Sequence, residues 1–183
     1  FLSVFHIDYE SYNVSARYLS YLLTPATVCL AVPLYQQLSL LKKARQAILA
    51  GTVTGVLTTM ATVLVLALLF QLTHEQYVTF LPKSITTAIG MGDPEEMGGI
   101  VTITVACIII TGIIGNIIAE TVCRLFHITE PVAKGIAIGS ASHAIGTTKA
   151  MEMGEIEGAM SSLAIAVSGL CTVLFASVFA NFI

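Results

Sequence analysis

The stretch Gly139–Lys149, which reads GSASHAIGTTK, decides the fold that we predict for this chain. It lies between apolar segments, yet its 11 residues carry four hydroxyls, an imidazole, an ammonium group and two glycines. Glycine weakens a helix by about 1 kcal/mol relative to alanine, and Ser and Thr offer the backbone competing hydrogen bonds. We therefore expect a helix broken inside a membrane, where non-helical backbone must be buried by protein or line a wet cavity. A polar loop outside the membrane is the alternative.

The composition is that of a membrane protein. Of 183 residues, 56% are hydrophobic and only 10% are charged, and the mean hydropathy is +0.89. Soluble domains carry about 25% charged residues, so most of this surface is expected to face lipid. We predict an all-α polytopic protein that crosses the cytoplasmic (inner) membrane several times. The net charge of −3 and the lack of a basic patch argue against a nucleic-acid partner.

The motifs of metal sites and hydrolases are missing from the sequence. The four cysteines are scattered and form no C-x-x-C or His/Cys pair, so we predict no metal, no cofactor and no disulfide framework. Nucleophile elbows, zinc-protease motifs and Walker loops are absent as well, so we do not expect an enzyme. Because the chain begins with Phe1, we expect that its first membrane spans are missing.

A second interrupted crossing is predicted near the start of the chain. Tyr18–Leu41 contains no charge and is long enough to cross, since about 20 apolar residues span a bilayer core. It contains Pro25 and Pro33, and proline removes a helical hydrogen bond. A broken helix near residues 24–35 is our prediction, and a merely kinked helix is the alternative.

Charges orient the remaining spans. Leu41–Arg45 is the densest basic cluster, and the positive-inside rule places it on the cytoplasmic side. Ala47–Phe70 then runs outward, Ile100–Ala119 returns, and Gly158–Ile183 is the last span. Asn116 is expected to make a hydrogen bond between helices.

A third polar interruption lies between the first two of these spans. Lys83–Gly90 has the same kinds of residue as Gly139–Lys149, with hydroxyls, one cation and a glycine. The segment from Tyr77 to Gly90 is too short to cross as a straight helix, which takes about 20 residues. We predict that Tyr77–Gly90 forms a re-entrant half-helix that enters from outside, with a broken-helix motif near residues 82–91, followed by an external acidic turn at Asp93–Glu96.

The three interruptions suggest an internal repeat within a single transmembrane domain that covers residues 1–183. Pro25, Ser84 and Ser142 are separated by 59 and 58 residues, and each precedes a connector and a glycine-bearing span. Internal repeats are common in secondary transporters, which bind substrate near the bilayer midplane between discontinuous helices. Whether the units are parallel or inverted stays open.

We expect the broken helices to meet near the midplane and to bind a small carboxylate. Exposed N–H groups and helix N-termini attract anions, Lys83 and Lys149 add positive charge, and His143 is suited to a coupling proton. Sodium is the alternative coupling ion, and the two lysines are alternatively only snorkelling to the interface. His143 is alternatively a structural hydrogen-bond donor between helices. The predicted substrate-binding residues are Thr27, Lys83, Ser84, Thr86, Thr87, Ser142, His143, Gly146, Thr147 and Thr148. The predicted structural breaks are Pro25, Pro33 and Gly139.

Three ordered motifs resemble the signatures of the LrgB/CidB membrane family. They are Pro25–Val28 with Ala31–Tyr35, Leu81–Thr87, and Ala137–Ala150 followed by Glu157–Ala159. The resemblance covers essentially the whole chain and extends to the C-terminal half of the plastid glycolate/glycerate translocator. The chain departs from the family at Ala144, where a glycine is frequent, and at Lys149, where an arginine is frequent. Arginine binds carboxylates bidentately and lysine does not, which weakens Lys149 as a ligand.

The resemblance implies two functions. The first is secondary transport of small 2-hydroxy- or 2-oxo-monocarboxylates such as glycolate, glycerate, lactate or pyruvate, by an elevator-like alternating-access movement. The second is an antiholin-like regulator of a holin-type pore, affecting murein hydrolase export and cell lysis. A small holin-like membrane protein of the LrgA/CidA type is the implied partner, and the uncharged spans offer faces for a homodimer.

Overall fold

The computed structural model describes residues 38–87 and 97–183, together with scattered positions between Tyr12 and Gln36. The two continuous ranges are helical and contain no strand, which confirms the all-α prediction. Their elements are α5 (Leu38–Phe70), α6 (His74–Phe80), α9 (Val101–Leu125), α10 (Pro131–Met153), α11 (Glu155–Phe179) and the short 3₁₀ helix η1 (Ala180–Phe182).

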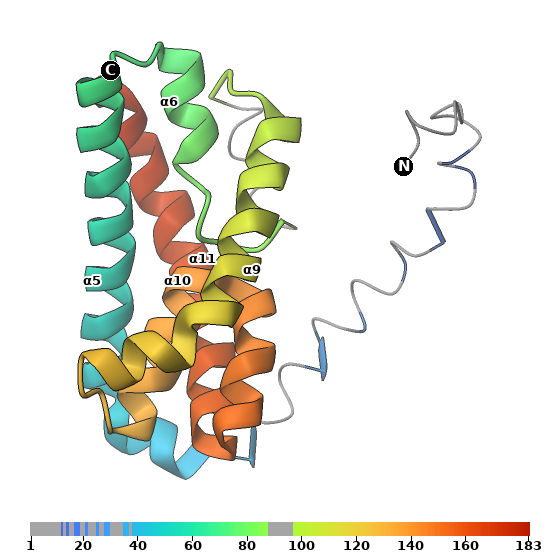
Figure 1. Cartoon of the computed structure of the whole chain (residues 1–183), viewed down its shortest axis with the longest axis vertical. Coiled ribbons are helices and arrows are strands. Elements are labelled where there is room, and N and C mark those ends of the chain that lie inside the picture. Colours follow the sequence, from blue (N-terminus) through green and yellow to red (C-terminus); the bar gives the residue numbers. More distant parts are fainter. Residues whose placement is uncertain are drawn as a thin grey trace.

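Three of these helices are long and apolar enough to cross a membrane. They cover Lys42–Phe70, Val101–Leu125 and Glu155–Phe182, and they contain the spans predicted from the sequence. The predicted crossing at Tyr18–Leu41 lies mostly outside the described residues. In Figure 1 α5 and α11 run along the long axis of the molecule, the lower part of α9 slants across the bundle, and α10 lies among these helices.

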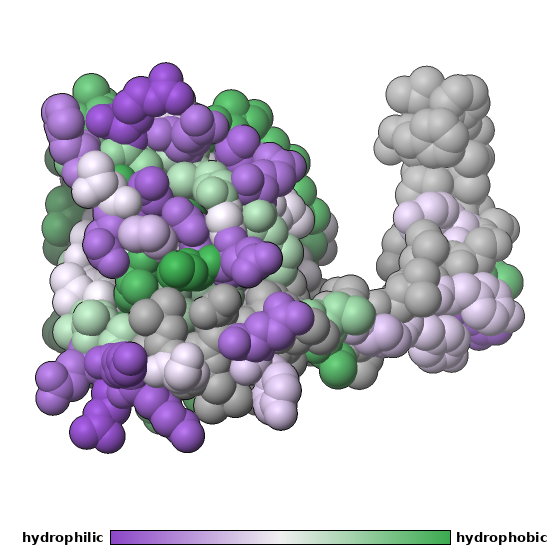
Figure 2. Space-filling model, turned by 90° about the horizontal axis from the view of Figure 1, so that it is seen from below, coloured by the Kyte–Doolittle hydropathy of each residue, from purple (hydrophilic) through white to green (hydrophobic). Residues whose placement is uncertain are grey.

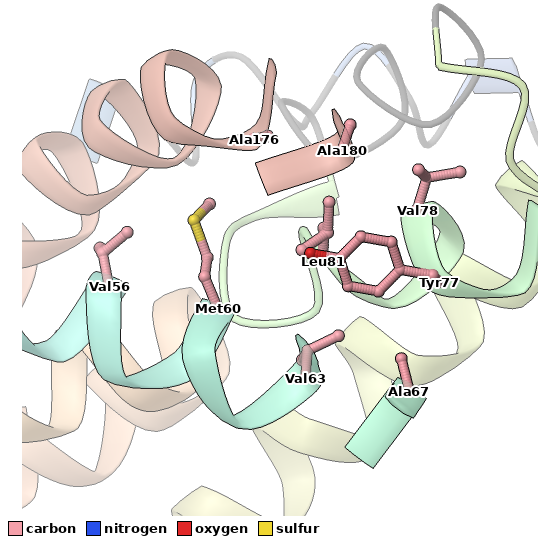
Figure 3. Packing of buried hydrophobic residues seen from close by; sticks show 9 residues of the cluster. All are labelled: Val56, Met60, Val63, Ala67, Tyr77, Val78, Leu81, Ala176 and Ala180. Atoms are coloured by element: carbon pink, nitrogen blue, oxygen red, sulfur yellow. The ribbon is translucent and has the colours of Figure 1, made fainter. Parts of the chain in front are cut away.

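The upper half of the bundle has one apolar core. It joins α5, α6 and the end of α11, and its fully buried side chains include Met60, Tyr77 and Leu81. Figure 3 shows the side chains of these elements converging. The Tyr77 hydroxyl donates a hydrogen bond of 2.9 Å to the carbonyl of Phe179. Such a core holds α6 at the upper end of the bundle.

Helix α10 doubles back on itself at His143, although it is continuous in hydrogen-bonding pattern. Ile138 and Ala150 belong to one buried cluster together with Ala119 of α9. On a straight helix these two residues would lie about 18 Å apart, so they cannot both touch one alanine. His143 has φ 41° and ψ −142°, which is not helical. The two halves of α10 therefore form a hairpin that enters the bundle from the lower end and returns there (Figure 1).

The segment from His74 to Thr87 enters the bundle from the opposite, upper end. Thr79 accepts a hydrogen bond from the N–H of Ile100 at 2.9 Å, and its carbonyl accepts one from Thr104 at 2.8 Å. The start of α9 thus lies beside the end of α6. The described part of the predicted half-helix is shorter than expected: α6 ends at Phe80 and residues 81–86 are not helical. Residues 88–96, including the predicted acidic turn, lie outside the described residues.

Charged side chains gather at the lower end of the bundle, where α5, α10 and α11 begin and α9 ends. Figure 2, which views this end from below, shows hydrophilic residues over most of its rim. Elsewhere in the two described ranges the charged residues are Glu75 and Lys83. The positive-inside rule, applied to Lys42, Lys43 and Arg45, predicts that the lower end is cytoplasmic.

Candidate functional site

The break in the stretch Gly139–Lys149 lies at His143. Sequence reasoning placed it at Gly139, but Gly139 is helical and packs against α11, where a side chain would strike the backbone of Ser161. A φ of 41° is rare for residues with a Cβ, and such conformations cost about 1–3 kcal/mol. They persist only where the surroundings enforce them, so the tip of the hairpin is a place to look for function.

A buried hydrogen bond fastens the tip to α9. His143 is 3% exposed, and its Nε2 lies 2.9 Å from the carbonyl oxygen of Ile108. Because a carbonyl only accepts, Nε2 must carry the proton. In the neutral ring Nδ1 is then the basic nitrogen, which leaves it as the atom able to gain a proton.

Two glycines of α9, Gly112 and Gly115, make room for the tip of the α10 hairpin. A methyl group at Gly112 would come within 2.7 Å of Cε1 of His143, and one at Gly115 would overlap Ser142. Gly146 lies against Ser142 and Ile138, where the hairpin returns. Small residues allow membrane helices to approach this closely. The contacts lie near the centre of α9, halfway along a membrane-length helix.

The hydroxyls after the tip have partners within the protein. Thr147 lies 2.7 Å from the hydroxyl of Ser161 in α11 and donates to the carbonyl of His143 at 2.9 Å. The side-chain amide of Asn116 donates to Thr148 at 2.8 Å and to the carbonyl of Ile145 at 2.8 Å, as expected for an interhelical residue. These side chains hold the hairpin between α9 and α11.

The loop after α6 brings a cation into the upper half of the bundle. Lys83 is half-buried, and its ammonium donates to the Ser84 hydroxyl at 3.2 Å. Ser84 is buried, while Thr86 and Thr87 are half-buried. The salt bridges recorded between described residues do not include Lys83.

The candidate site lies where these two segments meet on α9. Thr104 of α9 donates to the carbonyl of Thr79, at the end of α6 just before the loop, and the hairpin tip contacts Ile108 of α9. One segment comes from each end of the bundle. A single cation among hydroxyls and apolar walls favours a small anion, because a charge in a dry interior needs an opposite charge or strong hydrogen bonds.

Other residues that were predicted to bind substrate or to break a helix are not part of this candidate site. Pro25 is helical and exposed, so the structure does not bring it to the two buried segments. Thr27 and Pro33 lie outside the described residues. Ser161 was missed, although its position in the apolar start of α11 beside a second serine was a usable signal.

Lys149 is engaged at the lower end of the bundle. It contacts Glu152 at 3.2 Å and Glu120 at 3.6 Å. The hydrogen bond and charge of Glu152, together with the charge of Glu120, raise the pKa of Lys149 above its ordinary value. Lys149 is therefore compensated by carboxylates of this protein rather than placed at the tip.

A groove of roughly 620 Å³ lies on another side of α10. We call it the α5–α10 groove. Its walls are formed by residues within Ala47–Thr59 of α5 and Val132–Ala141 of α10, with Glu130 also lining it. None of the predicted substrate-binding residues lines it. Among the described residues, no group of three or more His, Cys, Asp or Glu side chains is placed to hold a metal ion.

Comparison with known proteins gives one consistent result. Residues 1–182 match the LrgB-like family. Proteins of Bacillus mycoides (strain KBAB4), Bacillus cereus (strain B4264) and Bacillus anthracis (strain CDC 684 / NRRL 3495) are each 37% identical over 183 residues, which is 100% of this chain and 80% of each relative. All three are named antiholin-like protein LrgB. No solved structure matches the chain at a significant level.

Proposed function

The chain belongs to the LrgB-like family, and on that premise we propose that it is a secondary transporter of small 2-hydroxy- or 2-oxo-monocarboxylates. One observation carries the proposal. Two re-entrant segments enter a membrane-spanning bundle from opposite ends and contact the same helix, α9, at Thr104 and at Ile108. Discontinuous segments that meet at depth are where secondary transporters bind substrate.

In this proposal Lys83 and Ser84 hold the carboxylate, and the hydroxyls of Thr86 and Thr87 bond the second oxygen function. The loop covers the site from the upper side and the α10 hairpin covers it from the lower side, so movement of either opens one side only. Nδ1 of His143 is the proposed carrier of a coupling proton, with sodium as the other candidate ion. The protein then works in the cytoplasmic membrane.

The test is uptake by purified protein in liposomes. Labelled glycolate, glycerate, lactate and pyruvate are offered under an inward proton or sodium gradient. We expect uptake of at least one of them, and a loss of tenfold or more in Lys83→Gln. Lys149→Gln is the matched control, because that lysine is already paired with two carboxylates, and it should transport normally. Absence of uptake by the unchanged protein, or full uptake by Lys83→Gln, would refute the proposal.

The names of the relatives favour a second candidate, an antiholin-like regulator of a holin-type pore. Its partner would be a small holin-like membrane protein, and a homodimer is the proposed assembly. A regulator that acts through helix packing should tolerate Lys83→Gln, provided that the variant still assembles in the membrane. A cell-lysis assay on the same two lysine variants therefore separates the candidates: regulation without dependence on Lys83 supports the pore regulator.

A further inference from the structure

The α5–α10 groove is built to receive a helix. Along its floor the two helices touch through glycines: a methyl group at Gly51 would come within 3.1 Å of Ile136, and one at Gly55 within 3.0 Å of the Ser140 hydroxyl. Beside this seam the groove is lined by Ala47, Thr54 and Thr58 of α5 and by Ala133, Ala137 and Ala141 of α10. These side chains are exposed and small, which leaves room for the close approach typical of membrane helices.

The chain also carries an uncharged segment whose described apolar side chains are exposed. Tyr18–Val32 directly precedes the link to α5 and contains no charge. Two of its described side chains, Tyr21 and Val28, are 71% and 64% exposed. As a helix it would be about 22 Å long, against about 18 Å for the stretch of α5 from Ala47 to Thr59.

We propose that Tyr18–Val32 of the same chain occupies the α5–α10 groove and runs antiparallel to α5. The direction follows from the charges, because the basic cluster at the start of α5 lies at the lower end and the uncharged segment before it must leave that end through the membrane. The covalent link to α5 keeps this segment at a high effective concentration beside the groove, which a separate helix does not have.

A hydrogen bond to threonine hydroxyls of the groove would favour this position of the segment. Pro25 has no N–H, so in a helix it leaves the carbonyl of Tyr21 without its usual donor. Hydroxyls of neighbouring helices re-satisfy such carbonyls in membranes. Thr54 and Thr58 line the groove and present donors of this kind, whereas lipid tails present none. The segment therefore gains in the groove a partner that it lacks on the lipid-facing side of α5.

The test uses Cys29, the cysteine already present in the segment and exposed in the structure. In a full-length variant with Cys107, Cys123 and Cys171 replaced by alanine, a second cysteine is placed at Ala47 or Ala133, both at the lower end of the groove. Leu49→Cys is the matched control, since Leu49 is on α5 and 54% exposed but does not line the groove. Membranes are treated with a short bismaleimide, and a monofunctional maleimide checks that every thiol reacts.

We expect an adduct within one chain from Ala47→Cys or Ala133→Cys and background from Leu49→Cys. Equal adduct from Leu49→Cys would place the segment on the lipid-facing side of α5 and overturn the proposal. An adduct between two chains, or with another protein, would mean that a second copy or a partner helix fills the groove. Reactive thiols that give no adduct at either groove position would also overturn it.

Discussion

At the scale of single residues, His143 is the residue at which α10 is interrupted. Composition alone predicted that Gly139–Lys149 breaks a helix, because glycine and hydroxyl side chains compete with helical geometry. The sequence did not reveal that the break lies on the histidine rather than on a glycine. A positive φ normally selects glycine, and here the imidazole hydrogen bond to Ile108 holds the strained backbone in place.

Two substitutions separate these effects. His143→Ala removes the hydrogen bond and keeps the strain, and we expect a loss of about 1–3 kcal/mol in the free energy of unfolding. His143→Gly removes the same hydrogen bond but relieves the strain, so it should be more stable than His143→Ala by about 1 kcal/mol. Thermal unfolding in detergent measures both. A glycine variant no more stable than the alanine variant would show that the backbone is not strained there.

Gly115 is the second residue that sequence reasoning undervalued. It was assigned no role of its own from the sequence, whereas the structure places it directly against Ser142 of the hairpin. Gly115→Ala should therefore displace the tip and destabilise the protein by about 1–3 kcal/mol, the usual cost of overpacking. Adding Ser142→Gly makes room for the new methyl group and should restore part of the loss. Unfolding of the single and double variants checks this, and equal stability of the two would contradict the contact.

At the scale of elements, the hairpin is held by hydroxyls and amides rather than by a large apolar core. Local propensity predicts where a helix is interrupted, but the direction in which the chain continues depends on the neighbours. Asn116 of α9 and Ser161 of α11, which belong to two other helices, bond its returning half. For that reason the sequence did not predict that α10 doubles back. It did not predict the end of α6 at Phe80 either, because that end also depends on neighbouring helices.

A double-mutant cycle on Thr147→Val and Ser161→Ala tests this connection between α10 and α11. Their hydroxyls lie 2.7 Å apart and are buried. Interhelical hydrogen bonds in membrane proteins average about 0.6 kcal/mol in such cycles, so we expect a coupling of about 0.6–1.5 kcal/mol in unfolding free energy. As a control, the exposed ion pair of Lys149 and Glu152 should give a smaller coupling than the buried hydroxyl pair. Independent effects of Thr147 and Ser161 would rule out the bond.

At the scale of the whole molecule, charge and length predicted most of the arrangement. Uncharged runs identified the spans that became α5, α9 and α11, and basic residues predicted which end is cytoplasmic. The convergence of all three breaks was not confirmed. The segments that carry two of them contact α9, at Thr104 and at Ile108, while Pro25 is exposed. Which segments meet depends on packing across the bundle, and a single sequence carries little information on that.

The most direct test of the central claim is the sidedness of the two ends of α10. In a variant whose four native cysteines are replaced by alanine, single cysteines are placed at Glu130, Glu155 and Glu75, and an impermeant maleimide is added to vesicles of known orientation. If α10 doubles back, Glu130→Cys and Glu155→Cys will react from the same side and Glu75→Cys from the other. Reaction of Glu130→Cys and Glu155→Cys from opposite sides would mean that α10 crosses the membrane as a straight helix, which would contradict the account.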